Sequence, residues 1–185
     1  MNILLHTCCG ICAGGVAERL LAEGHRVTGY FFNPNIHPAE EYERRLQVAQ
    51  AIARHIGFPL VVGEYDSQRW LAAVTGLESE PEGGRRCAIC YSFRLLETQR
   101  VALERGFDAF TTTLTVTPRK PAAVVNRVGT EIGGGRFLAR DFKKQDGFKR
   151  TNEIARKLGV YRQHYCGCVY SLPATAGQPS TANPQ

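Results

Sequence analysis

The alternation of short β-branched segments with longer helical segments limits the possible folds of this chain more than any other feature. Apolar residues recur at helical spacing between stretches that are rich in Val, Ile, Thr and Phe. Strands are predicted at residues 1–6, 26–32, 60–65, 108–117 and 136–141. Helices are predicted at residues 10–23, 38–55, 66–77, 90–105, 122–132 and 148–158. We therefore expect an α/β protein with one parallel sheet and helices on both of its faces.

The length of 185 residues suits one domain, which we expect to span residues 1–171. Residues 172–185 are rich in Pro, Ser, Thr and Ala, and they are predicted to be a disordered tail. No stretch approaches the roughly 20 apolar residues that cross a bilayer, and the first residues lack the basic region and cleavage site of a signal peptide. We expect a cytoplasmic protein with no membrane partner.

In a parallel sheet, ligands bind in the crevice outside the carboxyl ends of the strands. The loops predicted to reach this crevice are residues 7–12, 33–37, 66, 115–120 and 141–143. His37 is placed there as a candidate proton donor, and Asp66 and Asp141 as candidate acids or ligands, although acidic residues at strand ends are also common helix caps. Asp108 begins its strand, so we expect it at the opposite edge in a structural role.

The chain has seven cysteines, and all of them fall in three tight groups. An odd number of cysteines without a secretory signal argues against a disulfide framework. Buried cysteines that merely replace small apolar residues would be more scattered. The groups are Cys8, Cys9 and Cys12, then Cys87 and Cys90, then Cys166 and Cys168.

The first two groups have the composition of a metal site. Cys8 and Cys9 follow the first strand, and both groups lie near predicted helix N-termini, where thiolates are favoured. Cys9/Cys12 and Cys87/Cys90 form paired C-x-x-C knuckles that can close a tetrahedral zinc site. The adjacent Cys8–Cys9 pair is not a zinc knuckle, however, and it lies at the predicted crevice. Spacing alone leaves zinc and an iron–sulfur cluster both open.

Cys166-Gly-Cys168 suggests redox chemistry. A disulfide across C-x-C closes a very small ring and is easily reduced, so the pair can store two electrons reversibly. Further metal ligation or two idle thiols are the alternatives. The preceding residues 161–165 (YRQHY) are basic and aromatic, as in segments that stack on bases and contact phosphates, although an ordinary amphipathic segment has the same composition.

The charge balance favours an anionic partner. Lys and Arg total 23 against 17 Asp and Glu, which gives a formal net charge of +6 and attraction to polyanions such as nucleic acid. Neither G-x-x-x-x-G-K-[ST] nor G-x-G-x-x-G occurs, so the sequence offers no support for nucleotide hydrolysis or a dinucleotide cofactor.

Five motifs in order resemble one family along nearly the whole chain: TCCGIC, FNPNIHPAEEYERR, CAICYSFRL, TTTLTVTP and YRQHYCGCVYS. Together they resemble the cobalamin-independent epoxyqueuosine reductases of the QueH type. The resemblance implies a HUP-like (adenine nucleotide alpha hydrolase-like) three-layer α/β/α fold for a single catalytic domain. In this fold the cysteine loop 7–12 replaces the phosphate loop of related nucleotide enzymes.

The activity that the resemblance implies is reduction of the epoxide of epoxyqueuosine to the alkene of queuosine, at the wobble position of tRNA. Cys8, Cys9, Cys87 and Cys90 match the family's [4Fe–4S] ligands, while Cys12 is unassigned, which leaves room for an additional iron. The family uses neither cobalamin nor a nucleotide. Residues 117–120 (TPRK) depart from the expected Ser-Pro-Tyr-Gln, which bears on substrate contacts there and not on the reaction.

Cys166 and Cys168 match the redox-active pair that is proposed for the family. Epoxide reduction to alkene and water takes two electrons and two protons, and a thiolate-rich iron site can also polarise the epoxide oxygen. We take Asp141 or His37 as the proton relay, tRNA carrying epoxyqueuosine as the partner, and an unidentified protein or small molecule as electron donor. The alternatives are a zinc-stabilised tRNA-binding module and a cluster-dependent tRNA thiolation enzyme.

Overall fold

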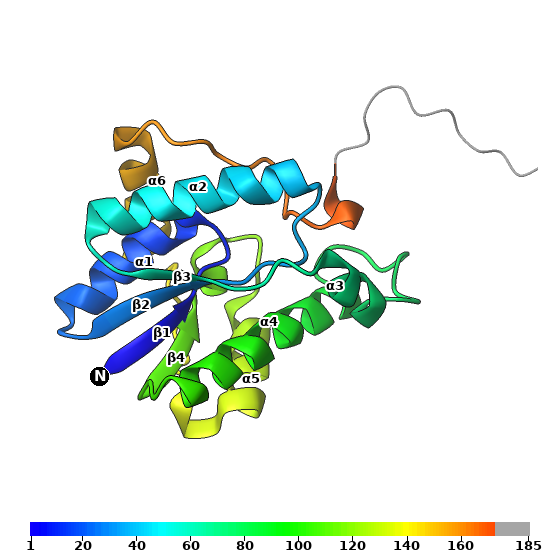
Figure 1. The fold of residues 1–185 in the computed structure, drawn as a ribbon, viewed down its shortest axis with the longest axis horizontal. Coiled ribbons are helices and arrows are strands. Elements are labelled where there is room, and N and C mark those ends of the chain that lie inside the picture. Colours follow the sequence, from blue (N-terminus) through cyan, green and yellow to red (C-terminus); the bar gives the residue numbers. More distant parts are fainter. Residues whose placement is uncertain (173–185) are drawn as a thin grey trace, which may run out of the picture.

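The computed structural model describes residues 1–172 and contains a four-stranded, all-parallel sheet (Figure 1). The strands are β1 (Asn2–His6), β2 (Arg26–Phe31), β3 (Leu60–Val62) and β4 (Ala109–Thr112), in the order β3-β2-β1-β4. The two halves of the chain leave β1 in opposite directions across the sheet, so the crevice lies at the end of β1. The tail expected from residue 172 lies, from residue 173 on, outside the described residues.

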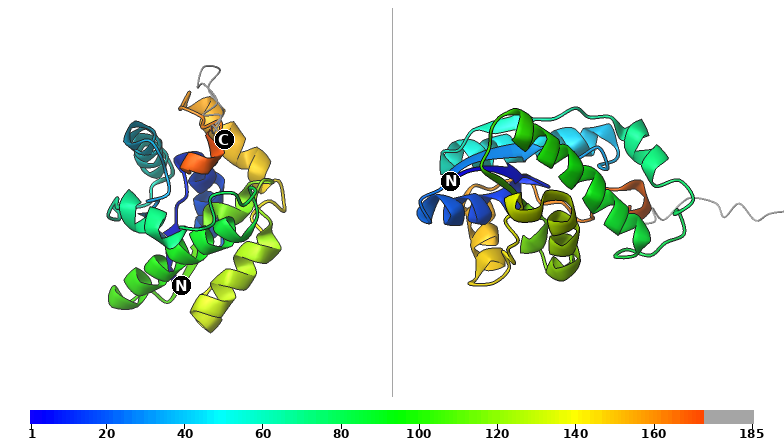
Figure 2. Two further views of the ribbon diagram at one scale, coloured as in Figure 1. Left: turned by 90° about the vertical axis from the view of Figure 1, so that its right-hand side faces the viewer. Right: turned by 90° about the horizontal axis from the view of Figure 1, so that it is seen from below.

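Helices cover both faces of this sheet, as predicted (Figure 2). On one face, Ile3 and Leu5 of β1 pack with α1 (Gly10–Ala22), α2 (Ala39–Ile56) and α6 (Gly147–Lys157). On the other face, Leu4 packs with α4 (Arg85–Glu104) and α5 (Ala122–Gly133). This alternation of side chains along β1 is the two-residue period of a strand that is buried on both faces. A short helix, α3 (Ser67–Ala73), precedes α4.

The prediction of a fifth strand at residues 136–141 is wrong. Residues 134–136 form a 3₁₀ turn, and Phe137 makes only an isolated bridge with Phe110. One backbone hydrogen bond continues the sheet, from the Leu138 N–H to the Phe110 carbonyl at 2.9 Å. The Phe137 ring packs instead against the backbone of Gly129 in α5, where any side chain would overlap it. Burial of this aromatic ring therefore outweighs the β propensity of the segment.

Several predicted boundaries also differ from the structure, and the helix predicted at 66–77 ends at Ala73. The strand predicted at 108–117 ends at Thr112, whose hydroxyl accepts the Leu114 N–H at 3.1 Å and starts the 3₁₀ helix η1 (Thr113–Val116). The strand predicted at 60–65 ends at Val62. Helix α4 begins at Arg85, five residues before the predicted start at Cys90. Cys87 and Cys90 consequently lie on consecutive turns at the beginning of one helix.

Asp108 lies at the edge opposite the crevice, as predicted. Its carboxylate accepts the Asn2 N–H at 2.6 Å, and its own N–H donates to the Asn2 carbonyl at 3.0 Å, which joins β4 to the start of β1. Within residues 1–172, no helix is both long and apolar enough to cross a bilayer.

Candidate functional site

Three sulfur atoms gather where β1 ends and α1 begins. The Sγ atoms of Cys8, Cys9 and Cys12 all lie within 4.8 Å of one another. Cys9 is the N-cap of α1, and its sulfur accepts the Cys12 N–H at 3.3 Å. Thr113 of η1 fixes Cys8 from the other side, because its hydroxyl oxygen accepts the Cys8 N–H at 3.0 Å and its hydroxyl donates to the Cys8 sulfur at 3.2 Å.

Close packing of α1 against α2 positions this cysteine loop. A Cβ on Gly10, the first residue of α1, would lie 2.5 Å from the Ala49 nitrogen and 2.5 Å from the Val48 carbonyl carbon in α2. Only glycine allows this approach, so the sequence C-C-G-x-C brings the N-terminus of α1 and its unpaired N–H groups to the sulfur atoms. The helix dipole there favours thiolates.

The pKa values of the three thiols are shifted in different directions. Hydrogen bonds from the Cys12 and Cys9 thiols lower the pKa of Cys8 well below its usual range, and the charge of Lys120 acts in the same direction. The same hydrogen bond to Cys8, together with burial, raises the pKa of Cys12. Of the three thiols, Cys8 is the one whose surroundings favour the thiolate form most.

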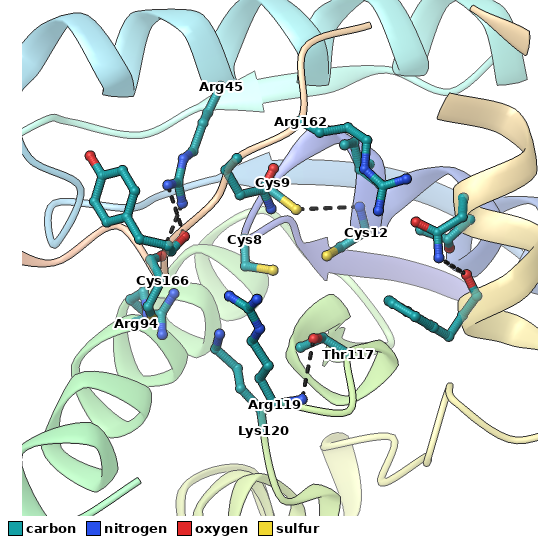
Figure 3. Close-up of a pocket in the computed structure, with 16 residues that line it drawn as sticks. Cys8, Cys9, Cys12, Arg45, Arg94, Thr117, Arg119, Lys120, Arg162 and Cys166 are labelled. Atoms are coloured by element: carbon teal, nitrogen blue, oxygen red, sulfur yellow. Dashed lines mark hydrogen bonds between the residues drawn. The ribbon is translucent and has the colours of Figure 1, made fainter. Parts of the chain in front are cut away.

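The sulfur atoms form the floor of a cationic pocket of about 160 Å³ (Figure 3). Its walls come from α2, α4, α6, the loop after η1 and the segment that follows α6. None of its lining residues, all within the described part of the chain, is Asp or Glu. Its cationic residues are Arg45, Arg94, Arg119, Lys120 and Arg162.

Two of these cations, Arg94 and Lys120, lie near the cysteines. Burial opposes the charge on Lys120, but the neighbouring sulfur groups of Cys166 and Cys8 outweigh burial and raise the pKa of the ammonium group. Arg94 is 3% exposed, and its Nε donates to the Cys90 carbonyl at 3.1 Å. Its Nη2 is buried and has no hydrogen-bond partner within residues 1–172. Both groups can donate to an additional anion at this place.

The other four cysteines form a second group beside the first. Cys166 lines the same pocket, while Cys168 packs with Cys90 against Trp70. Burial raises the pKa of the Cys87 and Cys90 thiols. In the described residues, only Cys8, Cys9 and Cys12 satisfy the 4.8 Å spacing for a shared metal ion, so the structure brings Cys12 to the first group and leaves Cys87 and Cys90 outside it. All seven cysteines are free thiols.

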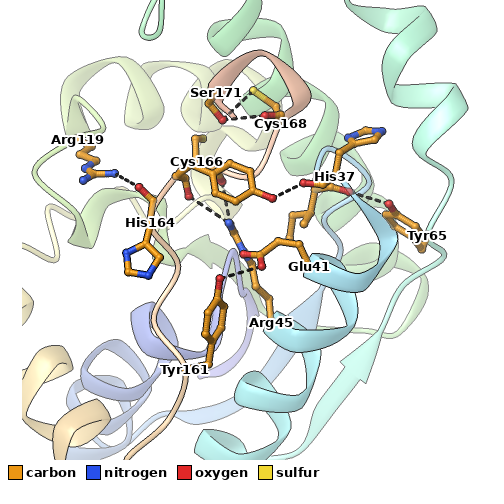
Figure 4. A network of polar contacts seen from close by, with 12 residues as sticks. His37, Glu41, Arg45, Tyr65, Arg119, Tyr161, His164, Cys166, Cys168 and Ser171 are labelled. Carbon is orange, nitrogen blue, oxygen red and sulfur yellow. Dashed lines mark hydrogen bonds and ion pairs between the residues drawn. The ribbon is translucent and has the colours of Figure 1, made fainter. Parts of the chain in front are cut away.

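A buried ion pair in α2 holds the segment 161–168, which we term the strap (Figure 4). Glu41 and Arg45 pair at 2.7 Å with side-chain exposures of 6% and 3%. Arg45 also donates to the carbonyls of Cys166 at 2.9 Å and Tyr165 at 3.1 Å. Glu41 accepts the Tyr161 hydroxyl at 2.9 Å. These bonds keep Cys166 over the pocket.

The three candidate acids and bases lie in different surroundings. His37 donates from Nδ1 to the Asn35 carbonyl at 3.0 Å, and its Nε2 is buried without a partner in residues 1–172. Its ring centroid lies 5.8 Å from that of Trp70, and Trp70 in turn packs with Cys90 and Cys168. Asp141 does not line the pocket and pairs with Lys143 at 3.0 Å. Asp66 caps α3 by accepting the Arg69 N–H at 3.0 Å.

Burial opposes ionisation of Asp141, but its hydrogen bonds with Lys143 outweigh burial and lower the pKa of the carboxyl group. An ion-paired carboxylate outside the pocket is poorly placed to deliver a proton there.

Sequence reasoning did not single out Arg45, Arg94 or Thr113. A signal existed for two of them, because Glu41–Arg45 and Cys90–Arg94 each have the four-residue spacing that places side chains on one helix face. Thr113 had no such signal, since it lies inside a run of threonines that reads as a strand.

The donors present fit a thiolate-bound metal or iron–sulfur centre. Thiolates are soft ligands that select zinc, copper(I) or iron–sulfur clusters over Mg²⁺ or Ca²⁺. The unpartnered Arg94 Nη2 and the charge of Lys120 would stabilise an anionic, sulfur-rich group. Fold and site together define an α/β protein with a thiol-based metal or iron–sulfur site at its strand ends, beside a pocket for anions.

Comparisons with known proteins agree with this class and narrow it. The family model described as "Epoxyqueuosine reductase QueH" matches residues 3–174. A protein of that name from Streptococcus pyogenes serotype M1 is 38% identical to this chain, and the match covers 92% of this chain and 70% of that protein. One from Thermotoga maritima is 35% identical, and the match covers 92% of this chain and 90% of that protein. A third, from Dehalococcoides mccartyi, is 30% identical over 97% of both chains. The chain belongs to the QueH family of epoxyqueuosine reductases.

Among solved structures, the chain is similar to the U34-tRNA thiolase NcsA from Methanococcus maripaludis with its [4Fe–4S] cluster. The TM-score is 0.56 at 15% identity, and the match covers 94% of this chain and 62% of the thiolase chain. This likeness confirms the HUP-like fold and carries no further argument about activity.

Proposed function

We propose that this chain is an oxidoreductase that reduces the epoxide of epoxyqueuosine to the alkene of queuosine at the wobble position of tRNA. The observation that carries the proposal is the group formed by Cys8, Cys9 and Cys12 on the floor of a cationic pocket, in a member of the QueH family. Thiolation is not favoured, because the curated relatives are named reductases.

The cofactor in this proposal is a [4Fe–4S] cluster held by Cys8, Cys9, Cys87 and Cys90. When bound, such a cluster passes single electrons and can act as a Lewis acid. Cys9 and Cys12 lie at the N-terminus of α1 and Cys87 and Cys90 in the first turns of α4, and Arg94, which donates to the Cys90 carbonyl and lines the pocket with Cys8 and Cys9, keeps a free donor at Nη2 within residues 1–172. Cys12 adjoins the same place and could ligate an additional iron.

Cys166 and Cys168 act in the proposal as the two-electron donor. Oxidation of the dithiol to a disulfide releases two electrons and two protons, and conversion of an epoxide to an alkene and water consumes the same number of each. Cys166 lines the pocket and Cys168 packs behind it, so one thiol faces the substrate. An external electron donor then restores the dithiol.

Proton delivery is assigned to His37 rather than Asp141. Neither side chain lines the pocket, but Nε2 of His37 is buried without a partner in residues 1–172 and can exchange a proton with a bound group, whereas the Asp141 carboxylate pairs with Lys143. A change in the pH profile of turnover for His37→Gln, and none for Asp141→Asn, is the expected result. An unchanged profile for His37→Gln would remove that assignment.

The test of the function is an anaerobic assay. Protein purified without oxygen should be brown and contain iron, and with a chemical reductant it should convert epoxyqueuosine in tRNA to queuosine. Cys8→Ser should lose iron and activity together, whereas Cys166→Ser should keep iron and lose activity. A colourless protein with stoichiometric zinc would favour a binding module, and ATP-dependent sulfur transfer would favour thiolation. Either outcome refutes the proposal.

A further inference from the structure

Phe148 is the most exposed of the Phe, Tyr and Trp residues within residues 1–172, and it lines the cysteine pocket. It is 39% exposed, whereas the other phenylalanines of the chain are buried or half-buried. A partly exposed ring in a basic pocket presents a flat apolar face to whatever binds there. Phe148 lies on the first turn of α6 and lines the pocket together with Arg119 and Arg162.

The turn before Phe148 is strained. Gln145 and Asp146 have φ angles of 57° and 58°, and they are the only non-glycine residues with positive φ in the described chain. The next residue must be glycine, because a Cβ on Gly147 would overlap the carbonyl oxygen of Phe142. Two consecutive left-handed residues cost conformational free energy, and such strain is found where it positions a functional group.

Helix α6 holds Phe148 on a rigid support. Arg150 forms two hydrogen bonds with Glu18 of α1, at 2.6 Å and 2.8 Å. Thr151 and Ile154 are buried against the same helix, and the side chain of Asn152 donates to the Phe148 carbonyl at 2.7 Å. Helix α6, which forms one wall of the pocket, is therefore fixed to α1, the helix that follows the cysteine loop. A group placed on the ring keeps its position relative to the sulfur atoms.

We propose that Phe148 is the stacking surface for the nucleobase that carries the epoxide. Every nucleobase presents a flat π face, and an aromatic side chain on the rim of a basic pocket is the usual platform for an unpaired base. Arg119 and Arg162, both exposed, then contact the flanking phosphates. With the base on Phe148, its substituent extends toward the floor formed by Cys8. The inference rests on the proposed function and assigns the base-binding residue of that site.

The experiment measures binding of an anticodon stem-loop RNA that carries epoxyqueuosine. Phe148→Ala should weaken binding about tenfold to a hundredfold, the range expected for loss of one base–aromatic stack. Phe148→Tyr should bind like the parent protein. Leu103→Ala is the matched control, because Leu103 is 50% exposed but lies at the far end of α4. Its binding should not change.

A second readout detects stacking directly. In Phe148→Trp, the new indole should be quenched when the RNA binds, against the constant emission of Trp70, which is 1% exposed. The inference is overturned if Phe148→Ala binds as tightly as the parent, if the indole is not quenched at saturation, or if Phe148→Ala loses iron. These measurements need no turnover, so loss of the proposed activity in the parent protein and failure of the stacking contact give different results.

Discussion

Replacing Arg45 with methionine should both destabilise the protein and release the strap. The substitution removes the 2.7 Å ion pair with Glu41 and the two hydrogen bonds to strap carbonyls at 2.9 Å and 3.1 Å. It leaves the buried Glu41 carboxylate with the Tyr161 hydroxyl as its remaining hydrogen-bond partner within residues 1–172. Breaking a buried ion pair in this way costs about 3–5 kcal/mol.

We expect the lower end of that range, because the strap can move and admit water to the carboxylate. A loss of about 3 kcal/mol in the free energy of unfolding corresponds to a fall in Tm of about 6–12 °C for a domain of this size. Urea unfolding of the metal-loaded protein under nitrogen measures the loss. Adding Glu41→Gln should recover part of it, since the unpaired charge is then removed.

Alkylation of Cys166 distinguishes strap release from simple destabilisation. Cys166 is half-buried under the Arg45 bonds, so Arg45→Met should increase its rate of modification by iodoacetamide, measured by mass spectrometry under native conditions. Arg100→Met is the matched control, because Arg100 pairs with Glu97 and Glu104 on an exposed face of α4. It should change neither quantity. If Arg45→Met loses stability while Cys166 is modified at the parent rate, Arg45 does not hold the strap.

Two further substitutions test the packing around the cysteine loop. Gly10→Ala should cost about 1–3 kcal/mol and lower the iron content, because its Cβ would lie 2.5 Å from the Ala49 nitrogen. Gly135→Ala is the control, since a Cβ there meets nothing within 4 Å, and equal losses would refute the argument. Burial and the charge of Arg94 lower the pKa of His6 from 6.5 to about 3, so its stability contribution is complete above pH 6.5 and is lost as the pH falls toward 3. His6→Gln should reduce the stability lost between pH 7.5 and 5.5 by about 1 kcal/mol, and an equal loss in parent and variant would contradict this assignment.

The order of elements could be predicted because burial on both faces leaves a clear pattern in the sequence. Strands β1 and β2 are short apolar runs between helical periods, and their bounds differ from the prediction by one residue. The prediction of a strand at 136–141 failed because β propensity is a local property of the sequence, whereas the position of Phe137 is determined by its packing against α5. Thr112 likewise ends β4 through its own side chain, which a count of β-branched residues cannot reveal.

From the sequence, only those cysteines that are close together along the chain could be predicted to lie close together in space. Cys8, Cys9 and Cys12 belong to one strand–helix junction, so their meeting follows from adjacency. Bringing Cys166 to the same pocket needs Arg45, which lies 121 residues away in sequence. A long-range bond of this kind has no periodic signal, and a buried arginine is not distinguishable from a surface one in a helix that also carries exposed charges.

The cationic side chains of the pocket differ in burial, and this difference determines what each of them can contact. Arg45 and Arg94 are buried and bond to the strap and to α4, so their charges act on sulfur and backbone rather than on solvent. Arg119 and Arg162 are exposed at the rim. The Glu41 carboxylate neutralises Arg45 and sulfur groups lie near Arg94, whereas the rim charges remain available to phosphates. One electrostatic arrangement therefore stabilises a thiolate centre and draws an RNA strand to it, which explains why such a pocket excludes carboxylates among the described residues.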